Sequence, residues 1–147
     1  MTLQITLQHR FAGFALDVAF EAPAGVTALF GRSGSGKTTV INAVAGLLRP
    51  DRGRIVVSGE TLLETARGVN LPPHRRRIGY VFQDARLFPH LTVRQNLLYG
   101  RWFAPRQQGI AEERIVDLLG IAPLMARRPG ALSGGEKSRV AIGRAIL

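Results

Sequence analysis

The sequence predicts a mixed α/β fold, in which an antiparallel sheet and a strand–loop–helix unit are followed by a helical region. Three observations lead to it. Two N-terminal segments alternate apolar and polar residues with a period of two, as strands with one buried face do. A mainly apolar run without alternation at residues 26–30 precedes a glycine-rich loop and apolar residues at helical spacing. Residues 92–130 read as short helical segments separated by glycine and proline.

The strands are assigned from this apolar periodicity. Residues 3–7 and 14–20 place apolar side chains at every second position, and their short connection predicts a hairpin. Residues 26–30 and 78–82 do not alternate, which is typical of strands that are buried on both faces of a sheet. Residues 54–58 form another short β-rich run, and a polar loop is expected after it.

The helices are assigned from apolar spacing and from their stop signals. One helix follows the glycine-rich loop, and Gly46 and Pro50 mark its end. A second helix is expected over residues 111–119, with an apolar face made of Ile115, Leu118 and Leu119. A third is expected over residues 136–147, where it follows a Gly-Gly turn and ends in an apolar run without a stop signal. We therefore expect the chain to have been cut at this end.

Composition sets limits on function. The 147 residues suit one domain, and the absence of cysteine excludes disulfides, thiolate nucleophiles and cysteine-based metal sites. The sequence shows neither a secretory signal nor the roughly 20 apolar residues of a membrane-spanning helix, so we expect a soluble or peripheral protein. The net charge of +10 leaves two explanations open. The charge can indicate a partner that is a polyanion or an anionic membrane. It can also indicate that the chain is a piece of a longer protein whose remaining part is acidic.

The glycine-rich loop carries the most specific pattern. Residues 31–38, GRSGSGKT, fit G-x-x-x-x-G-K-[ST] at every fixed position. Glycines let successive backbone N–H groups point at an anion, the following helix adds its positive end, and Lys37 can reach terminal phosphates. The alternative, a flexible glycine turn, is disfavoured by the strand expected before the loop and the helix expected after it. The segment predicts a phosphate site in which the Thr38 hydroxyl can ligate Mg²⁺.

A second constellation is LSGGE, residues 132–136. Ser133 followed by two glycines ahead of a helix is an ordinary N-cap with a permissive turn. The same arrangement also makes a second backbone nest for phosphate at a helix N-terminus. Both interpretations stay open at this point.

Taken together, the motifs resemble those of the ABC-transporter ATPases. Residues 132–145 resemble the signature motif and helix of that family, the loop at 31–38 lies where the family has its P-loop, and Gln83 follows residues 80–82 as the Q-loop glutamine does. The resemblance implies a P-loop ATPase core with an antiparallel β subdomain and a helical subdomain, truncated before the Walker B strand. It divides residues 1–147 into 1–91, the β subdomain and P-loop core, 92–131, the helical subdomain, and 132–147, the signature motif and helix.

A finer resemblance is to the ATP-binding subunits of bacterial molybdate importers. It rests on residues 53–59, 72–90 and 92–100. Importers of sulfate, iron, polyamines and sugars share much of this pattern, so they remain alternatives. The resemblance implies an ATP-hydrolysing subunit that drives molybdate uptake, located peripherally on the cytoplasmic face of the bacterial inner membrane. Its partners would be a second copy, arranged head to tail, and an integral membrane permease that contacts residues 84–99.

The resemblance also implies roles for individual residues, with ATP and Mg²⁺ as cofactors. Lys37 and Gln83 would act in catalysis, Gln83 by sensing water and Mg²⁺, and Thr38 and Gln83 would bind the metal. Ser133, Gly134 and Gly135 would contact nucleotide bound by the second subunit. Phe11, in preference to Phe14, would stack on adenine. The loop residues that would bind the nucleotide are Gly31, Arg32, Ser33, Gly34, Ser35, Gly36, Lys37, Thr38 and Thr39.

Several family features are absent from this sequence. After the signature helix the family has the Mg²⁺-binding Asp, the catalytic Glu and a switch His, and some members add a C-terminal oxyanion-binding domain. We therefore expect the 147-residue chain alone to be inactive, and a non-hydrolysing nucleotide-binding fragment is the alternative function. A nucleic-acid-binding module is disfavoured because the arginines are scattered and few aromatics accompany them. A repair or translation ATPase is disfavoured by the segment from Gln83 to Tyr99.

Overall fold

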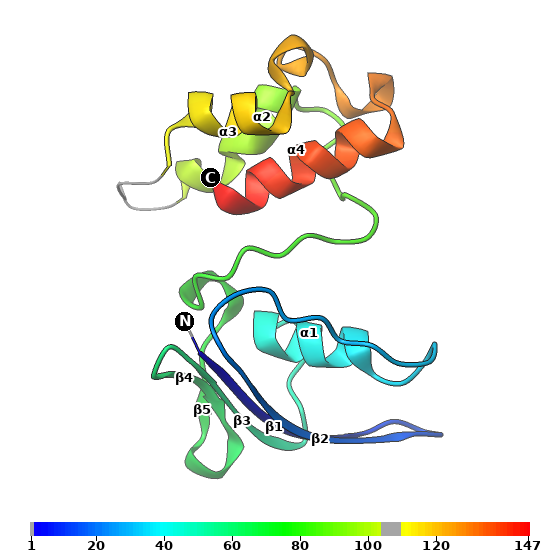
Figure 1. Cartoon of the computed structure of the whole chain (residues 1–147), viewed down its shortest axis with the longest axis vertical. Coiled ribbons are helices and arrows are strands. Elements are labelled where there is room, and N and C mark those ends of the chain that lie inside the picture. The colour runs from blue at the N-terminus through cyan, green and yellow to red at the C-terminus, as the bar shows by residue number, and fades with distance from the viewer. Residues whose placement is uncertain (1, 104–109) are drawn as a thin grey trace. The chain divides into compact units, whose positions relative to one another are not determined.

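A computed structural model describes residues 2–103 and 110–147. The chain forms two compact units, one ending at Ile78 and the other beginning at Gly79 (Figure 1). The first contains an antiparallel sheet and one α-helix, and the second is helical. No helix in the described ranges is long and apolar enough to cross a membrane.

The described part of the first unit contains a five-stranded antiparallel sheet in the order β2-β1-β3-β4-β5. Its strands are β1 (Leu3–Arg10), β2 (Ala15–Ala22), β3 (Arg52–Val57), β4 (Glu60–Glu64) and β5 (Val69–Asn70). The predicted N-terminal hairpin is confirmed, with Leu3 opposite Ala22 and Arg10 opposite Ala15. The polar loop expected after β3 is wrong, because β4 and β5 extend the sheet there. Leu62 and Leu63 are both buried in β4, so its apolar residues do not alternate.

Helix α1 (Lys37–Ala45) packs on one face of this sheet (Figure 1). Alternate residues of the strands face the helix, because side chains of a strand point to opposite sides in turn. The shared core contains Ile5, Leu7, Leu16, Ile55, Leu62, Leu63, Val40 and Ala43. The helix ends at Gly46, whose left-handed backbone (φ +79°) donates its N–H to the carbonyls of Ala43 and Asn42. The predicted helix and its glycine stop are therefore confirmed.

A buried arginine completes the C-terminal end of α1. Arg76 follows the 3-10 turn Pro73–Arg75 and is only 4% exposed. Its Nη1 donates to the carbonyl oxygens of Ala43 and Val44, at 2.7 and 2.9 Å. Its Nε donates to Leu71 O at 2.7 Å and its Nη2 to Asn70 Oδ1 at 2.8 Å. The guanidinium thus ties the helix that begins at the glycine-rich loop to the segment after β5.

The second unit is built from α2 (Val93–Leu98), α3 (Glu112–Leu119) and α4 (Gly134–Ile146), with 3-10 turns at Tyr99–Trp102, Ala122–Leu124 and Pro129–Ala131. Its core contains Val93, Leu97, Val116, Ile121, Leu124, Leu132 and Val140. The predicted face of α3 is partly wrong, since Leu118 is 75% exposed and Val116 is buried. At 100° per residue, Val116 and Leu119 lie on one side of Ile115 and Leu118 on the other.

Two predicted buried strands are not strands in the structure. Residues 26–30 and 78–82 have no strand pairing, and Val26, Phe30 and Val81 are 102%, 92% and 45% exposed. A strand is held by hydrogen bonds to a neighbouring strand, so an apolar run alone does not make one. Within the described residues the sheet consists of β1 to β5, and neither segment joins it.

The compact units divide the chain at a different position from the predicted subdomains. Residues 79–91 belong with the helices because the buried side chain of Asn96 in α2 holds the backbone of Phe88 and Leu91. Residues 132–147 also belong there, since α4 packs on α2 and α3. As functional subdomains, the ranges 1–91, 92–131 and 132–147 stay a prediction.

Candidate functional site

The glycine-rich loop at residues 31–38 enters α1 through backbone that favours glycine. Gly34 and Gly36 have φ of +79° and +89°, in the left-handed region. Ser35 N donates to Arg32 O at 3.2 Å and closes the loop. Gly36 is the N-cap of α1 and offers no side chain to the first helical turn, which contains no acidic residue. The first-turn N–H groups can therefore bind an anion beside the positive end of the helix.

Lys37 brings a cation to the same loop. Its ammonium group donates to Gly31 O at 2.8 Å and to Arg32 O at 2.7 Å, and lies 3.3 Å from Ser35 Oγ. These contacts hold the lysine head against the loop backbone. An ammonium in this place supplies a compact positive charge for phosphate oxygens, which the lysine of this motif is suited to bind.

The loop forms one wall of a cavity of about 490 Å³. Two aromatic residues, Phe11 and Phe14, line it with loop residues Ser33, Gly34, Ser35, Gly36, Lys37, Thr38 and Thr39. The two rings are stacked, with centroids 6.4 Å apart and planes 18° apart. Phe11 N donates to Phe14 O at 2.7 Å, which closes the hairpin turn. Phe14 precedes β2, so its expected place on the strand is wrong, and the structure brings both aromatics to the cavity.

The donors of the cavity fit a polyphosphate. Backbone N–H groups, a lysine and two serines converge there, whereas none of its lining residues is acidic. For Mg²⁺ the cavity offers the exposed Thr38 hydroxyl, and the described residues group no three His, Cys, Asp or Glu that could hold a metal ion. Mg²⁺ is commonly bound by few protein ligands together with substrate phosphates and water. Thr38 fits such a metal, which would be held mainly by phosphate oxygens.

The LSGGE segment begins α4 with a capping box. Glu136 N donates to Ser133 Oγ at 3.3 Å, and Ser133 N donates to the Glu136 carboxylate at 2.7 Å. The hydrogen bond from the Ser133 backbone lowers the pKa of Glu136. The predicted N-cap is therefore confirmed. Ser133, Gly134 and Gly135 are exposed, so their predicted contact with nucleotide in a second subunit is compatible with the cap and stays a prediction.

Gln83 lies in an exposed segment of the second unit. The residues just after it are attached to α4, since Arg144 donates from Nη1 to Arg86 O at 2.9 Å and from Nη2 to Ala85 O at 3.1 Å. Burial lowers the pKa of the Arg144 guanidinium. The predicted metal and catalytic roles of Gln83 stay predictions.

Two supporting residues were missed by the sequence reasoning. Asn96 is fully buried, and its side chain accepts from Phe88 N at 2.8 Å and donates to Phe88 O, Leu91 O and Thr92 O. Arg144 holds the segment after Gln83. A polar residue inside an otherwise apolar helical stripe is the signal that could have found Asn96. No sequence signal distinguishes Arg144 from the many other arginines of the chain.

Alignments with similar proteins cover the whole chain or nearly all of it. A protein named "Molybdenum import ATP-binding protein ModC" from Rhizobium johnstonii is 62% identical over 148 residues, which cover 100% of this chain and 42% of the relative. A protein of the same name from Rhodospirillum rubrum is 58% identical over 146 residues, covering 99% of this chain and 40% of the relative. The chain thus spans about 40% of the length of these relatives.

Solved structures with the same fold include two dimeric cassettes. The ATP-binding cassette MJ0796, in a post-hydrolysis dimer bound to ADP and Pi, matches with a TM-score of 0.71 and 27% identity, over 99% of this chain and 69% of that one. A second dimeric structure of MJ0796, described as a bacterial ABC transporter cassette, matches with a TM-score of 0.69 and 26% identity over the same shares. The family model "ABC transporter" matches residues 16–147, and the chain therefore belongs to the ABC transporter family.

Proposed function

We propose that this chain is the nucleotide-binding part of an ATPase subunit that drives molybdate import through an ABC transporter. The observation that carries the proposal is 62% identity, over the entire chain, to a protein named for molybdenum import. The donors around residues 31–39 support it independently, because they suit a polyphosphate. Within the family, the sequence similarity to molybdenum importers is what favours molybdate over other solutes.

The nucleotide would bind with its phosphates on the loop and its base beside Phe11. Backbone N–H groups of residues 34–39 and the Lys37 ammonium would hold the phosphates, and Thr38 would ligate Mg²⁺. Phe11 and Phe14 line the same cavity, so either ring can offer its face to adenine. Both residues are 40% exposed, which leaves aromatic surface for stacking. We keep Phe11 as the stacking residue, since its ring is braced by His9.

The whole protein would act with two partners. A second copy, arranged head to tail, would bring Ser133, Gly134 and Gly135 to the nucleotide, a proposal that the dimeric state of the solved cassettes supports. An integral membrane permease would contact the segment from Asp84 to Tyr99. The protein would lie peripherally on the cytoplasmic face of the bacterial inner membrane. Gln83 would report the state of the metal and the attacking water to that segment.

The experiment is uptake of radioactive molybdate by cells in which the chromosomal gene carries Lys37→Ala. We expect molybdate uptake to fall to background, while excess sulfate does not compete with the wild-type uptake. The matched control is Arg54→Ala, which removes an exposed positive charge from β3. Full molybdate uptake with Lys37→Ala would contradict the ATPase role. Wild-type uptake that sulfate suppresses as well as unlabelled molybdate does would contradict the assigned solute.

A further inference from the structure

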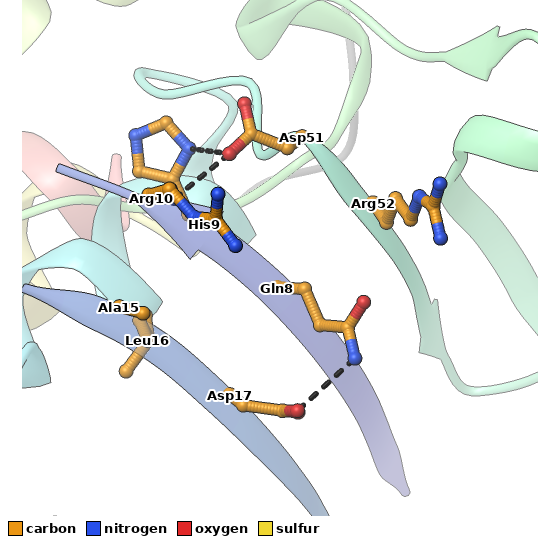
Figure 2. A pocket seen from close by; sticks show the side chains of 8 residues that line it. All are labelled: Gln8, His9, Arg10, Ala15, Leu16, Asp17, Asp51 and Arg52. Atoms are coloured by element: carbon orange, nitrogen blue, oxygen red, sulfur yellow. Dashed lines mark hydrogen bonds and ion pairs between the residues drawn. The ribbon is translucent and has the colours of Figure 1, made fainter.

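The turn end of the β1–β2 hairpin is tied to the start of β3 by one carboxylate. Asp51 precedes β3, and its Oδ2 accepts a hydrogen bond from Arg10 N at 2.8 Å. The same oxygen lies 3.3 Å from His9 Nδ1, within ion-pair distance (Figure 2). The bond from the Arg10 backbone lowers the pKa of Asp51, so this carboxylate stays charged over a wide range of pH. Asp51 therefore holds the backbone at the end of β1 and lies against the imidazole of His9.

The imidazole connects that carboxylate to the aromatic wall of the cavity. The His9 side chain is 18% exposed, and its ring meets the Phe11 ring edge to face, with centroids 4.5 Å apart and planes 85° apart. Phe11 in turn stacks on Phe14, and both line the cavity beside the glycine-rich loop. A continuous series of contacts thus runs from Asp51 through His9 to the two phenylalanines.

We propose that His9 and Asp51 are positioning residues that hold the Phe11 ring in the orientation that receives a nucleotide base. The proposal rests on the proposed function, because it assumes that the loop binds a nucleotide. Phe11 lies in a turn between two strands and is 40% exposed, so its own packing restricts it little. A ring that is already ordered loses less conformational freedom when it binds a base. His9 supplies that order through its ring, and Asp51 keeps the imidazole in place.

The contribution of His9 and Asp51 to nucleotide affinity should have a limited size and should concern only ligands that carry a base. Ordering one side chain in advance changes affinity about two- to tenfold, whereas the stacking face itself accounts for about ten- to hundredfold. Neither residue lines the cavity of the loop. Their loss should therefore weaken binding of a base-bearing ligand and leave binding of the bare phosphate chain unchanged. A general role in folding would weaken both ligands alike.

The hairpin offers a matched control. Gln8 Nε2 donates to Asp17 Oδ2 at 3.0 Å, one position away from His9 and across the same two strands (Figure 2). This bond also joins side chains of the hairpin, but the side chains of adjacent residues in a strand point to opposite faces. Gln8→Ala therefore removes a comparable cross-strand contact without touching the wall of the cavity.

The test measures dissociation constants of ATP and of inorganic tripolyphosphate by titration calorimetry. We expect wild type to bind ATP more tightly than tripolyphosphate. His9→Ala should lower this preference about two- to tenfold at unchanged tripolyphosphate affinity, and Gln8→Ala should not alter it. In the background of Phe11→Ala, His9→Ala should have no further effect. His9→Gln keeps a polar side chain of similar length near Asp51 but lacks the ring, so it should reproduce the lowered preference. It replaces His9→Ala if that variant does not fold.

The other outcomes separate this inference from the proposed function. If His9→Ala and His9→Gln leave the preference for ATP unchanged, or weaken both ligands equally, the positioning role is wrong and the nucleotide site stands. If wild type binds tripolyphosphate as tightly as ATP, no base is received and the inference is overturned, while the phosphate site stands. If wild type binds neither ligand, the proposed nucleotide site itself is wrong, and the inference falls with it.

Discussion

Replacing the buried Arg76 by methionine tests whether its guanidinium holds helix α1 in place. Arg76→Met keeps much of the side-chain volume and removes the charge together with four hydrogen bonds, to Leu71 O, Ala43 O, Val44 O and Asn70 Oδ1. Two of these acceptors are carbonyls in the last turn of α1, where helical N–H donors run out. Burial also lowers the pKa of Arg76, as expected for a charge withdrawn from water.

The size of the effect follows from how deeply each hydrogen bond is buried. The bond to Ala43 O is buried, and this carbonyl keeps its bond from Gly46 N, so the loss of the guanidinium costs about 1 kcal/mol there. The other three are only partly buried, and water can replace much of what is lost there. Methionine also avoids the cost of burying a charge, which offsets part of the loss. We expect the free energy of unfolding of the first unit to fall by about 2–4 kcal/mol.

The assay is urea denaturation followed by far-UV circular dichroism, on Arg76→Met and on Arg75→Met. Arg75 is its exposed neighbour in the sequence, so its replacement should change the free energy of unfolding by less than about 0.5 kcal/mol. A loss below about 1 kcal/mol for Arg76→Met, or equal losses for the two variants, would refute the reasoning.

Three further predictions concern the loop and the second unit. Gly36→Ala should lower the free energy of unfolding by about 2–4 kcal/mol in urea denaturation, because φ is +89° and a Cβ would lie 2.7 Å from Leu16 Cδ1. Gly34→Ala, where φ is also positive but no atom lies within 4 Å, should cost only about 1–2 kcal/mol, and equal losses would contradict the packing argument. The pKa of Glu136 is lowered in the folded protein. The ionised cap therefore stabilises α4 fully at pH above the ordinary pKa of 4.5, and this stabilisation is lost as the pH falls through the lower pKa of the folded state. An NMR titration of the Glu136 carboxyl checks this, and titration at 4.5 would contradict it. Asn96→Leu should lower the free energy of unfolding of the second unit by about 2–4 kcal/mol in urea denaturation. It should also speed hydrogen exchange at the Phe88 amide, because that amide loses its acceptor. Unchanged exchange at Phe88 would contradict the role of Asn96.

The parts that were predictable from the sequence are those with a local physical cause. Alternating side chains in β1 and β2 bury one face, so the hairpin could be predicted from spacing alone. Gly46 ends α1 because its left-handed backbone suits glycine. Ser133 caps α4 because a hydroxyl three residues before a glutamate, Glu136, can form a capping box. The glycine-rich loop was predictable for the same reason, since its function needs particular backbone conformations.

The parts that were missed depend on contacts between distant segments. Residues 26–30 and 78–82 look like buried strands, yet strand structure requires a paired neighbour, which a single segment does not reveal. Leu62 and Leu63 are both buried in β4, which conceals its period of two. The role of Arg76 could not be read from an Arg-Arg-Arg run, because only the fold shows which arginine meets the carbonyls of α1. The contact of His9 with Phe11 likewise appears only once the hairpin is built.

The central claim is that residues 31–39 bind the phosphates of a nucleotide, and titration calorimetry of ATP against wild type and Lys37→Ala tests it most directly. Lys37→Ala removes a charged donor worth about 1.5–3 kcal/mol, so the dissociation constant should rise about ten- to hundredfold. Arg54→Ala, which removes an exposed positive charge from β3, should bind ATP as wild type does. If Lys37→Ala binds ATP as tightly as wild type, or if wild type shows no binding, the assignment of this loop as a nucleotide site is contradicted.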